Sequence, residues 1–217
     1  MAERHADLGI TSLTNPRVKG VVKLRQRSHR DAFSRMLIEG YRENRRALDN
    51  GHAPEDIFFC EPLFQGENNE VLLNDARSAG AKLISCPPPV FKKMSYRDRP
   101  DGLLSVASQV HYGLDDIELK RAPFIVIAEA IEKPGNLGTI LRSSDAAGVD
   151  AVIVCDRCTD INNPNVVRAS VGTLFSVPVV ETTTEATIAW LAANEIQAVA
   201  TTPHTDKLYS DVDLTQG

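Results

Sequence analysis

An apolar run, followed closely by a glycine-containing turn and a helical pattern, constrains this chain more than any other feature. Residues 124–128 read Phe-Ile-Val-Ile-Ala, which has the length and β-branched content of a buried parallel strand. Residues 134–148 carry two early glycines, Gly135 and Gly138, and their leucine and isoleucine residues recur at helical spacing. The stretch therefore predicts a strand, a glycine-rich turn and a helix.

Two polar side chains of that helix are candidate ligand contacts. Asn136 is a good helix N-cap residue, and Arg142 follows six residues later, nearly two turns on and expected close to the same face. Gly135 and Gly138 would let the backbone approach a ligand closely. Donors at a helix N-terminus suit an anion or a ribose. The alternative is that the glycines only shape a turn and that Arg142 is a solvated helix charge.

A second stretch, residues 163–178, is also rich in polar and small residues and ends in an apolar run. Together the two stretches resemble the SpoU/TrmH family of RNA 2′-O-ribose methyltransferases, whose first motif is Asn-x-Gly-x-x-x-Arg. Asn136, Gly138 and Arg142 match this motif position for position. The resemblance implies a SPOUT-type α/β knot, S-adenosyl-L-methionine as the cofactor and a homodimer. It also implies that Arg142 is the catalytic arginine and that Asn136 orients it or the ribose.

Strand and helix patterns alternate in both halves, which predicts an α/β protein. The order of elements in the first half resembles the ribosomal-protein-like substrate-binding domain that precedes the catalytic domain in many SpoU/TrmH enzymes. We place an amino-terminal RNA substrate-binding domain at residues 1–108, a linker at 109–122 and a SPOUT methyltransferase domain at 123–217. The expected elements of the amino-terminal domain are a first helix after Asn15-Pro16, strands at 34–38, 56–60, 82–85 and 103–108, and helices at 41–49, 69–79 and 90–94.

The second half predicts a mostly parallel sheet with helices on both faces, and ligands of such sheets gather at the carboxyl ends of the strands. By analogy with the family, Thr201 and Thr202 are expected near the cofactor; strand-end hydroxyls satisfied within the protein are the equal alternative. The expected strands are 124–128, 151–155, 177–180 and 197–201, with helices at 136–147, around 165–170 and at 185–194.

The family's catalytic domain continues beyond the strand that matches residues 197–201. Residues 123–217 are too few for the complete knot and cofactor pocket, so we expect a longer natural chain. This shortfall keeps open a non-catalytic RNA-binding or ribosome-associated module on the same scaffold. An enzyme acting on a small phosphorylated substrate would explain the glycine-rich turn but would leave the basic amino terminus unused.

Basic residues are concentrated near the amino terminus of an otherwise acidic chain. The net charge is −5, yet ten of the 24 Lys and Arg residues lie between residues 15 and 46. A local basic patch is a footprint of nucleic-acid binding, although a solvated helix face is the usual meaning of a charge run. We expect structured RNA as the partner, ribosomal rather than transfer RNA. The expected RNA-binding residues are Arg17, Lys19, Lys23, Arg25, Arg27, Arg30, Arg42, Arg45, Arg46 and Arg168.

Several smaller features leave alternatives open. Residues 96–102 form a polar loop that could stack on a base or be a plain surface turn. Ser170, like Arg168, could contact RNA or a partner subunit, or cap a buried helix. The four cysteines, Cys60, Cys86, Cys155 and Cys158, are expected to be free thiols, and no metal site is predicted. Without a long apolar stretch, the protein is expected to be soluble and cytoplasmic.

The expected reaction is an in-line attack of a ribose 2′-hydroxyl on a methyl group. A guanidinium stays protonated in ordinary protein surroundings. We therefore expect Arg142 to act first as a clamp on phosphate and ribose.

Overall fold

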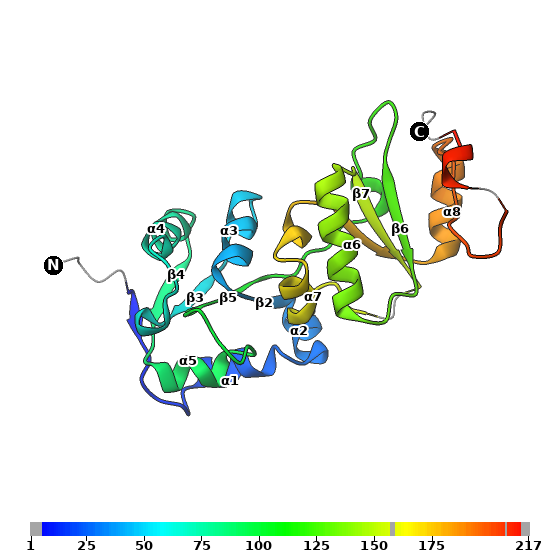
Figure 1. Ribbon diagram of the computed structural model, residues 1–217. Helices are drawn as coiled ribbons and strands as arrows, with labels where there is room; N and C mark the ends of the chain where they lie inside the picture. Colours follow the sequence, from blue (N-terminus) through cyan, green and yellow to red (C-terminus); the bar gives the residue numbers. More distant parts are fainter. Residues whose placement is uncertain (1–5, 157–158, 207, 214–217) are drawn as a thin grey trace.

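The computed structural model describes residues 6–156, 159–206 and 208–213. They form two α/β units that follow one another along the chain, each with its own sheet (Figure 1). Among these residues, no helix combines the length and the apolar character needed to cross a membrane.

The amino-terminal unit is built on a five-stranded mixed sheet in the order β1-β4-β3-β5-β2. β3 and β4 are parallel, whereas β5 runs antiparallel to both β3 and β2. Apolar residues of α1 and α5 pack on one face of the sheet, and those of α3 and α4 pack on the other (Figure 1). The strands are β1 (Leu8–Gly9), β2 (Arg35–Glu39), β3 (Asp56–Phe59), β4 (Lys82–Ser85) and β5 (Leu103–Ser108), and the helices are α1 (Pro16–Lys23), α2 (Arg27–Phe33), α3 (Tyr41–Asp49), α4 (Asn69–Ser78) and α5 (Pro88–Met94).

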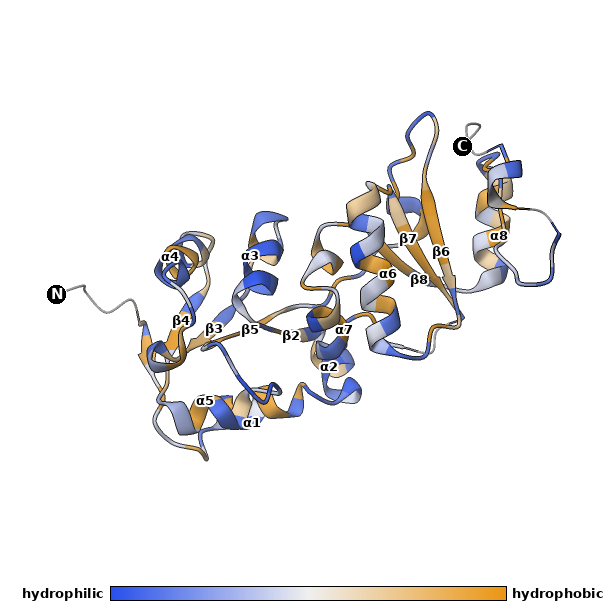
Figure 2. Cartoon of the chain, in the orientation of Figure 1, coloured by the Kyte–Doolittle hydropathy of each residue, from blue (hydrophilic) through white to orange (hydrophobic). Residues whose placement is uncertain are grey.

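The carboxy-terminal unit has a three-stranded parallel sheet in the order β6-β7-β8. α6 and α7 pack on one face of this sheet, and α8 packs on the other (Figure 1). The strands are among the most hydrophobic parts of the chain (Figure 2). The elements are β6 (Ile125–Glu129), α6 (Pro134–Ala147), β7 (Ala151–Cys155), α7 (Pro164–Ala169), β8 (Val179–Thr182) and α8 (Thr184–Ala193).

The two units share one apolar core. Met36 and Ile38 of β2 and Val110 belong to the same buried cluster as Leu141 of α6 and Val166 of α7. Residues 109–122, which we expected to be a linker, are partly anchored, because Val110 is buried and Tyr112 forms a β-bridge with Val180. The amino-terminal unit is therefore packed directly against the helices that carry the sequence motifs.

Turn and cap residues explain where the key helices begin and end. The Asn15 side chain accepts a hydrogen bond from the Arg17 backbone N–H at 2.9 Å, and Pro16 occupies the first turn of α1, where its missing N–H costs nothing. Gly148 ends α6 with a φ of 69°, a left-handed conformation that glycine adopts without strain. Gly40 has a φ of 114° between β2 and α3.

Most of the predicted elements are confirmed to within two residues, but two expectations are wrong and one helix was missed. Residues 197–201 form no strand, and all five are exposed. The β6 strand is parallel, as expected, but only Ala128 of its five residues is buried because β6 lies at an edge of the sheet. The helix α2 was not anticipated, since its sequence, RSHRDAF, has no apolar periodicity.

Candidate active site

The helix α6 carries the Asn-x-Gly-x-x-x-Arg pattern and begins directly after the loop that follows β6. It starts at Pro134 with Lys133 as its N-cap residue, so Asn136 lies within the first turn and is not the N-cap that we expected. Asn136 is exposed. Six residues of an α-helix rotate by about 600°, which places Asn136 and Arg142 about 120° apart. The expectation that they share one face is therefore wrong.

Gly138 lets two helices approach each other. A Cβ atom at this position would lie 2.6 Å from the carbonyl carbon of Ala169 and 2.7 Å from the backbone nitrogen of Ser170. No side chain could fit there without moving α7. The close approach that we expected between Gly138 and a ligand is thus made instead by the backbone at the end of α7, whereas a Cβ at Gly135 would meet nothing within 4 Å.

Arg142 is exposed, but its guanidinium is held by two neighbours. Its Nη1 donates to the backbone oxygen of Ala169, at the last residue of α7, and its Nη2 donates to the Thr139 hydroxyl at 3.2 Å. The Thr139 hydroxyl in turn donates to the Gly135 carbonyl at 3.0 Å. A guanidinium has five N–H donors, so this arrangement fixes the group and leaves donors for an anionic or hydroxyl ligand.

Thr139 was not among the predicted site residues. It lies three residues before Arg142 on the same helix, and residues three apart on a helix are neighbours. That spacing could have identified it from the sequence.

The helix α7 is short, and its start is fixed by polar contacts. Asn163 caps it by accepting a hydrogen bond from the Asn165 backbone N–H at 2.9 Å. Asp160, just before the cap, forms an ion pair with Arg30 of α2 at 2.5 Å, and both side chains are buried. Arg30 is therefore removed from the set of RNA-binding candidates, because RNA cannot reach it.

The other predicted RNA-binding residues divide into those whose side chains have a partner within the protein and those whose side chains have none among the described residues. Arg25 donates to the backbone oxygens of residues 93–95 and so caps the end of α5. The other paired arginines form ion pairs with carboxylates at the surface: Arg17 with Asp56, Arg27 with Asp31, Arg45 with Asp49 and Asp75, and Arg46 with Asp145.

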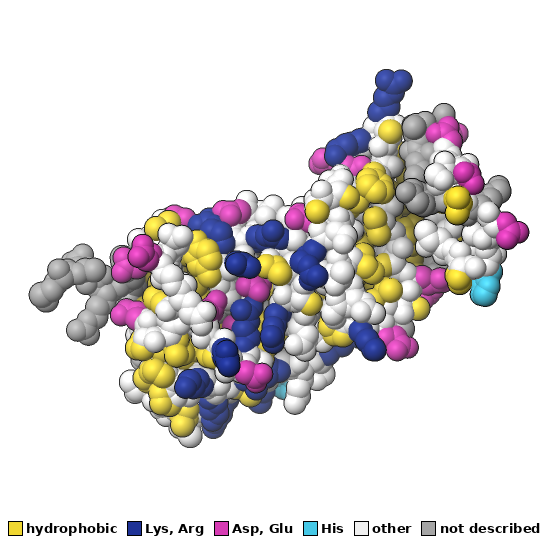
Figure 3. Space-filling view, viewed as in Figure 1, with side chains coloured by type: hydrophobic (Ala, Val, Ile, Leu, Met, Phe, Trp, Pro, Cys, Tyr) yellow, Lys and Arg dark blue, Asp and Glu magenta, His cyan; other side chains and the backbone are white. Residues whose placement is uncertain are grey.

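The side chains of four predicted RNA-binding residues are exposed and have no ion pair or hydrogen bond among the described residues: Lys19, Lys23, Arg42 and Arg168. Lys and Arg side chains gather over the amino-terminal unit on the face shown in Figure 3. Ion pairs at a surface cost little to break, so the paired surface arginines remain able to turn to phosphate. The basic face on the amino-terminal unit therefore stays a prediction for RNA contact, without Arg30.

The loop at residues 96–102 is mainly structural. The Tyr96 hydroxyl donates to the Pro164 carbonyl at 3.2 Å, and Arg97 pairs with Glu43 at 2.5 Å and donates to the Glu39 carbonyl. Burial raises the pKa of Glu39 and of Glu43, against the opposing effect of Arg97. Tyr96 and Arg97 are thus committed within the protein.

Ser170 is buried and donates to the Val167 carbonyl at 2.9 Å, which favours the helix-cap alternative for this residue.

The residues assigned to the cofactor do not form a pocket with α6. Thr201 and Thr202 are exposed and lie outside the sheet, and the Thr202 hydroxyl accepts a hydrogen bond from the His204 backbone N–H at 3.2 Å. A cavity of about 430 Å³ lies at the carboxyl ends of β1, β3 and β4, and one of about 330 Å³ lies beside Asp150 and Pro178. Neither is lined by Asn136 or Arg142, so these two cavities are not where S-adenosylmethionine would meet Arg142.

Three of the cysteines, Cys60, Cys86 and Cys155, are free thiols, as predicted. Cys158 lies outside the described residues.

Two family models match the chain. The SpoU rRNA Methylase family matches residues 123–217, and the MRM3-like substrate binding domain matches residues 15–105. The predicted domain boundaries at residues 108 and 123 stay predictions.

Curated relatives are rRNA methyltransferases. The chain is 35% identical over 162 residues to rRNA methyltransferase 3A, mitochondrial, of Danio rerio, covering 71% of this chain and 35% of that protein. It is 25% identical over 203 residues to the 23S rRNA (guanosine(2553)-2′-O)-methyltransferase RlmP of Bacillus subtilis, covering 94% of this chain and 77% of that protein. The chain thus spans about a third of the first relative and about three quarters of the second.

Solved structures agree with these relatives. An RNA 2′-O ribose methyltransferase is 37% identical with a TM-score of 0.78, covering 94% of this chain and 77% of that one. An AdoMet-bound rRNA methyltransferase from Sinorhizobium meliloti is 30% identical with a TM-score of 0.76, covering 86% of this chain and 69% of that one. The predicted fold class and the family resemblance are confirmed by these likenesses.

Proposed function

The chain belongs to the SpoU rRNA methylase family, and on that premise we propose that it transfers a methyl group from S-adenosylmethionine to a ribose 2′-hydroxyl in structured RNA. The observation that carries this proposal is the exposed guanidinium of Arg142, held by the Ala169 carbonyl and the Thr139 hydroxyl. Ribosomal RNA is the proposed substrate, because the relatives named above are rRNA methyltransferases.

When bound, S-adenosylmethionine supplies an electrophilic methyl group. The part played by this chain is to hold the RNA. Arg142 presents its remaining N–H donors to the phosphate and ribose of the target nucleotide, which fixes the 2′-hydroxyl for in-line attack. The basic side chains of the amino-terminal unit bind the flanking phosphates and give the complex its salt dependence.

We further propose a homodimer located in the cytoplasm. Exposed apolar side chains on the carboxy-terminal unit support the dimer: Phe124 is 53% exposed and Ile188 of α8 is 61% exposed. Sedimentation velocity at micromolar concentration tests it, and a single monomeric species would contradict it. The cytoplasmic location stays a prediction.

The test of the proposed reaction is methyl transfer from methyl-labelled S-adenosylmethionine to unmodified ribosomal RNA, with transfer RNA as the comparison substrate. We expect label in ribosomal RNA as a 2′-O-methyl group, detected as a dinucleotide that resists alkaline hydrolysis. RNA that binds in a salt-dependent manner but takes up no label would contradict the reaction and favour the non-catalytic module. Label on a base would contradict the ribose as the acceptor.

A further inference from the structure

The short helix α7 is held at its start by the amino-terminal unit and at its end by Arg142. Of its six residues, Pro164 accepts a hydrogen bond from the amino-terminal unit and Ala169 accepts one from Arg142. α7 therefore lies between the two parts of the proposed reaction, RNA binding and the catalytic arginine.

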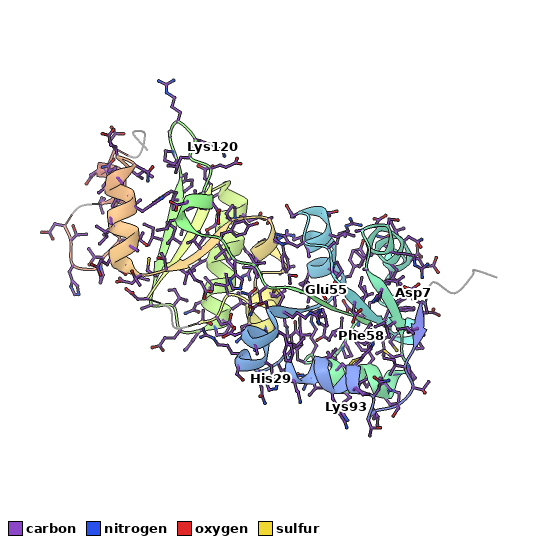
Figure 4. The ribbon with its side chains drawn as sticks, turned by 180° about the vertical axis from the view of Figure 1, so that it is seen from behind. Asp7, His29, Glu55, Phe58, Lys93 and Lys120 are labelled. Carbon is purple, nitrogen blue, oxygen red and sulfur yellow. The ribbon has the colours of Figure 1, made fainter. Side chains whose placement is uncertain are left out.

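The first contact is the buried ion pair between α2 and the loop before α7. Arg30 is 1% exposed; its Nη2 donates to Asp160 at 2.5 Å, and its Nη1 donates to the backbone oxygens of Leu24 at 3.0 Å and Arg25 at 2.8 Å. α2, the helix that carries His29 in Figure 4, lies beside the carboxy-terminal unit. These three acceptors hold the buried guanidinium in place, and the guanidinium in turn holds the Asp160 carboxylate.

Asp160 also makes hydrogen bonds with the residues at the start of α7. Its second carboxylate oxygen accepts from the Asn162 backbone N–H at 2.8 Å, and its carbonyl accepts from the Asn163 backbone N–H at 3.0 Å. Asn163 is the N-cap of α7. The ion pair therefore fixes the residue from which α7 starts.

Two further contacts from the amino-terminal side hold the same segment. The Asn162 side chain accepts from the Val110 backbone N–H at 2.8 Å and donates to the Val110 carbonyl at 3.1 Å. The Tyr96 hydroxyl donates to the Pro164 carbonyl at 3.2 Å. Burial raises the pKa of Tyr96, so the phenol keeps its proton and remains a donor.

The other end of α7 acts on Arg142. Gly138 brings α6 into backbone contact with Ala169 and Ser170, and the Ala169 carbonyl accepts from the guanidinium. A shift of α7 would therefore move an acceptor that holds Arg142. Small misplacements of a positioned group lower catalytic rates strongly.

We propose that the amino-terminal unit positions Arg142 through α7, with Tyr96, Arg30 and Asp160 as positioning residues. The proposal rests on the proposed methyl transfer. It assigns these three residues a role in the rate of the reaction, whereas the basic surface residues act on RNA affinity.

Tyr96→Phe is the decisive variant, because it removes one hydroxyl and keeps the ring. We expect kcat for methyl transfer to fall about three- to tenfold, as expected for one lost hydrogen bond, with the KM for RNA unchanged within about twofold. Tyr41→Phe is the matched control. It makes the same change in the same unit, at a ring that packs against the core cluster of β3 and α4 and whose hydroxyl makes no hydrogen bond among the described residues, so kcat and KM should stay at the wild-type values.

A second background separates positioning from general destabilisation. In Arg142→Lys protein, Tyr96→Phe should lower kcat by less than about twofold, because the group that it positions is already altered. If Tyr96→Phe lowers kcat as much in the Arg142→Lys background as in the wild-type background, the proposal is overturned. An unchanged kcat in the single Tyr96→Phe variant would also overturn it.

Asp160→Asn should lower kcat further, but it leaves Arg30 without its anionic partner and can unfold the protein. It is therefore compared only if its unfolding midpoint lies above the assay temperature.

Hydrogen exchange gives a readout that does not need activity. In Tyr96→Phe protein, amides of Val166 to Ala169 should exchange faster than in the wild type, while amides of β3 remain unchanged. If the wild type transfers no methyl group, the proposed function fails, and this measurement still decides whether Tyr96 holds α7. Unchanged exchange in α7 would overturn the inference while leaving RNA methylation intact.

Discussion

The two sheets of this protein are built from similar apolar strands, yet they are covered to different degrees. β5 of the first sheet buries five of its six residues, whereas β6 of the second buries one of five. Helices cover both faces of the first sheet along its central strands, while β6 lies at an edge with Ile127 41% exposed. An apolar run thus specifies a strand, and the neighbouring elements determine how much that strand contributes to the core.

The largest expected difference between the sheets is in the cost of removing a phenylalanine. Phe58 of β3 is 1% exposed, and Phe124, directly before β6, is 53% exposed (Phe58 is labelled in Figure 4). Phe58→Ala should lower the free energy of unfolding by about 3 to 5 kcal/mol, and Phe124→Ala by less than about 1 kcal/mol. Urea unfolding followed by circular dichroism measures both. Equal losses would show that the two sheets are equally covered in solution.

The next largest effect tests the contact between α6 and α7. Gly138→Ala forces α7 away from α6 and should cost about 1 to 3 kcal/mol of unfolding free energy, together with a loss of methyl transfer. Gly135→Ala in the same helix meets no atom within 4 Å and should leave stability unchanged or raise it by up to about 1 kcal/mol. If Gly138→Ala were as stable and active as Gly135→Ala, the close packing of the two helices would be wrong.

A smaller effect is expected in the well-covered first sheet, where a buried carboxyl group makes the stability depend on pH. Burial raises the pKa of Glu39 at the end of β2, although hydrogen bonds from Ser95 and the Tyr96 backbone act against it. Between the ordinary and the raised pKa, the native protein holds a proton on Glu39 that the unfolded chain has released. This stabilising contribution is therefore fully present below the ordinary pKa and is lost as the pH rises through the raised one.

Glu39→Gln should remove the fall in stability that accompanies the release of this proton. The unfolding free energy of the wild type, measured by urea titration from pH 4 upward, should fall relative to that of Glu39→Gln. Parallel pH profiles for the two proteins would contradict a raised pKa.

The sequence predicted the strands well, because apolar runs bounded by glycine and proline report local structure directly. It also predicted which helix carries Asn136 and Arg142. It could not predict that Arg30 is buried, since ten basic residues in one stretch look alike until the fold brings Asp160, 130 residues away, next to one of them.

Gly138 shows the same limit. The motif marks the position, but whether a ligand or another helix approaches the glycine depends on where residues 169 and 170 lie. The assignment of Thr201 and Thr202 to the cofactor depended on a strand that residues 197–201 do not form.

The most direct test of the account compares Arg142→Lys with the wild type in methyl transfer and in RNA binding. Lysine keeps the positive charge but lacks the planar fork that reaches the Ala169 carbonyl and the Thr139 hydroxyl together. We predict a fall in kcat of at least about tenfold, with RNA affinity unchanged within about twofold. A kcat close to the wild-type value would contradict the assignment of Arg142 as the residue that holds the reacting ribose.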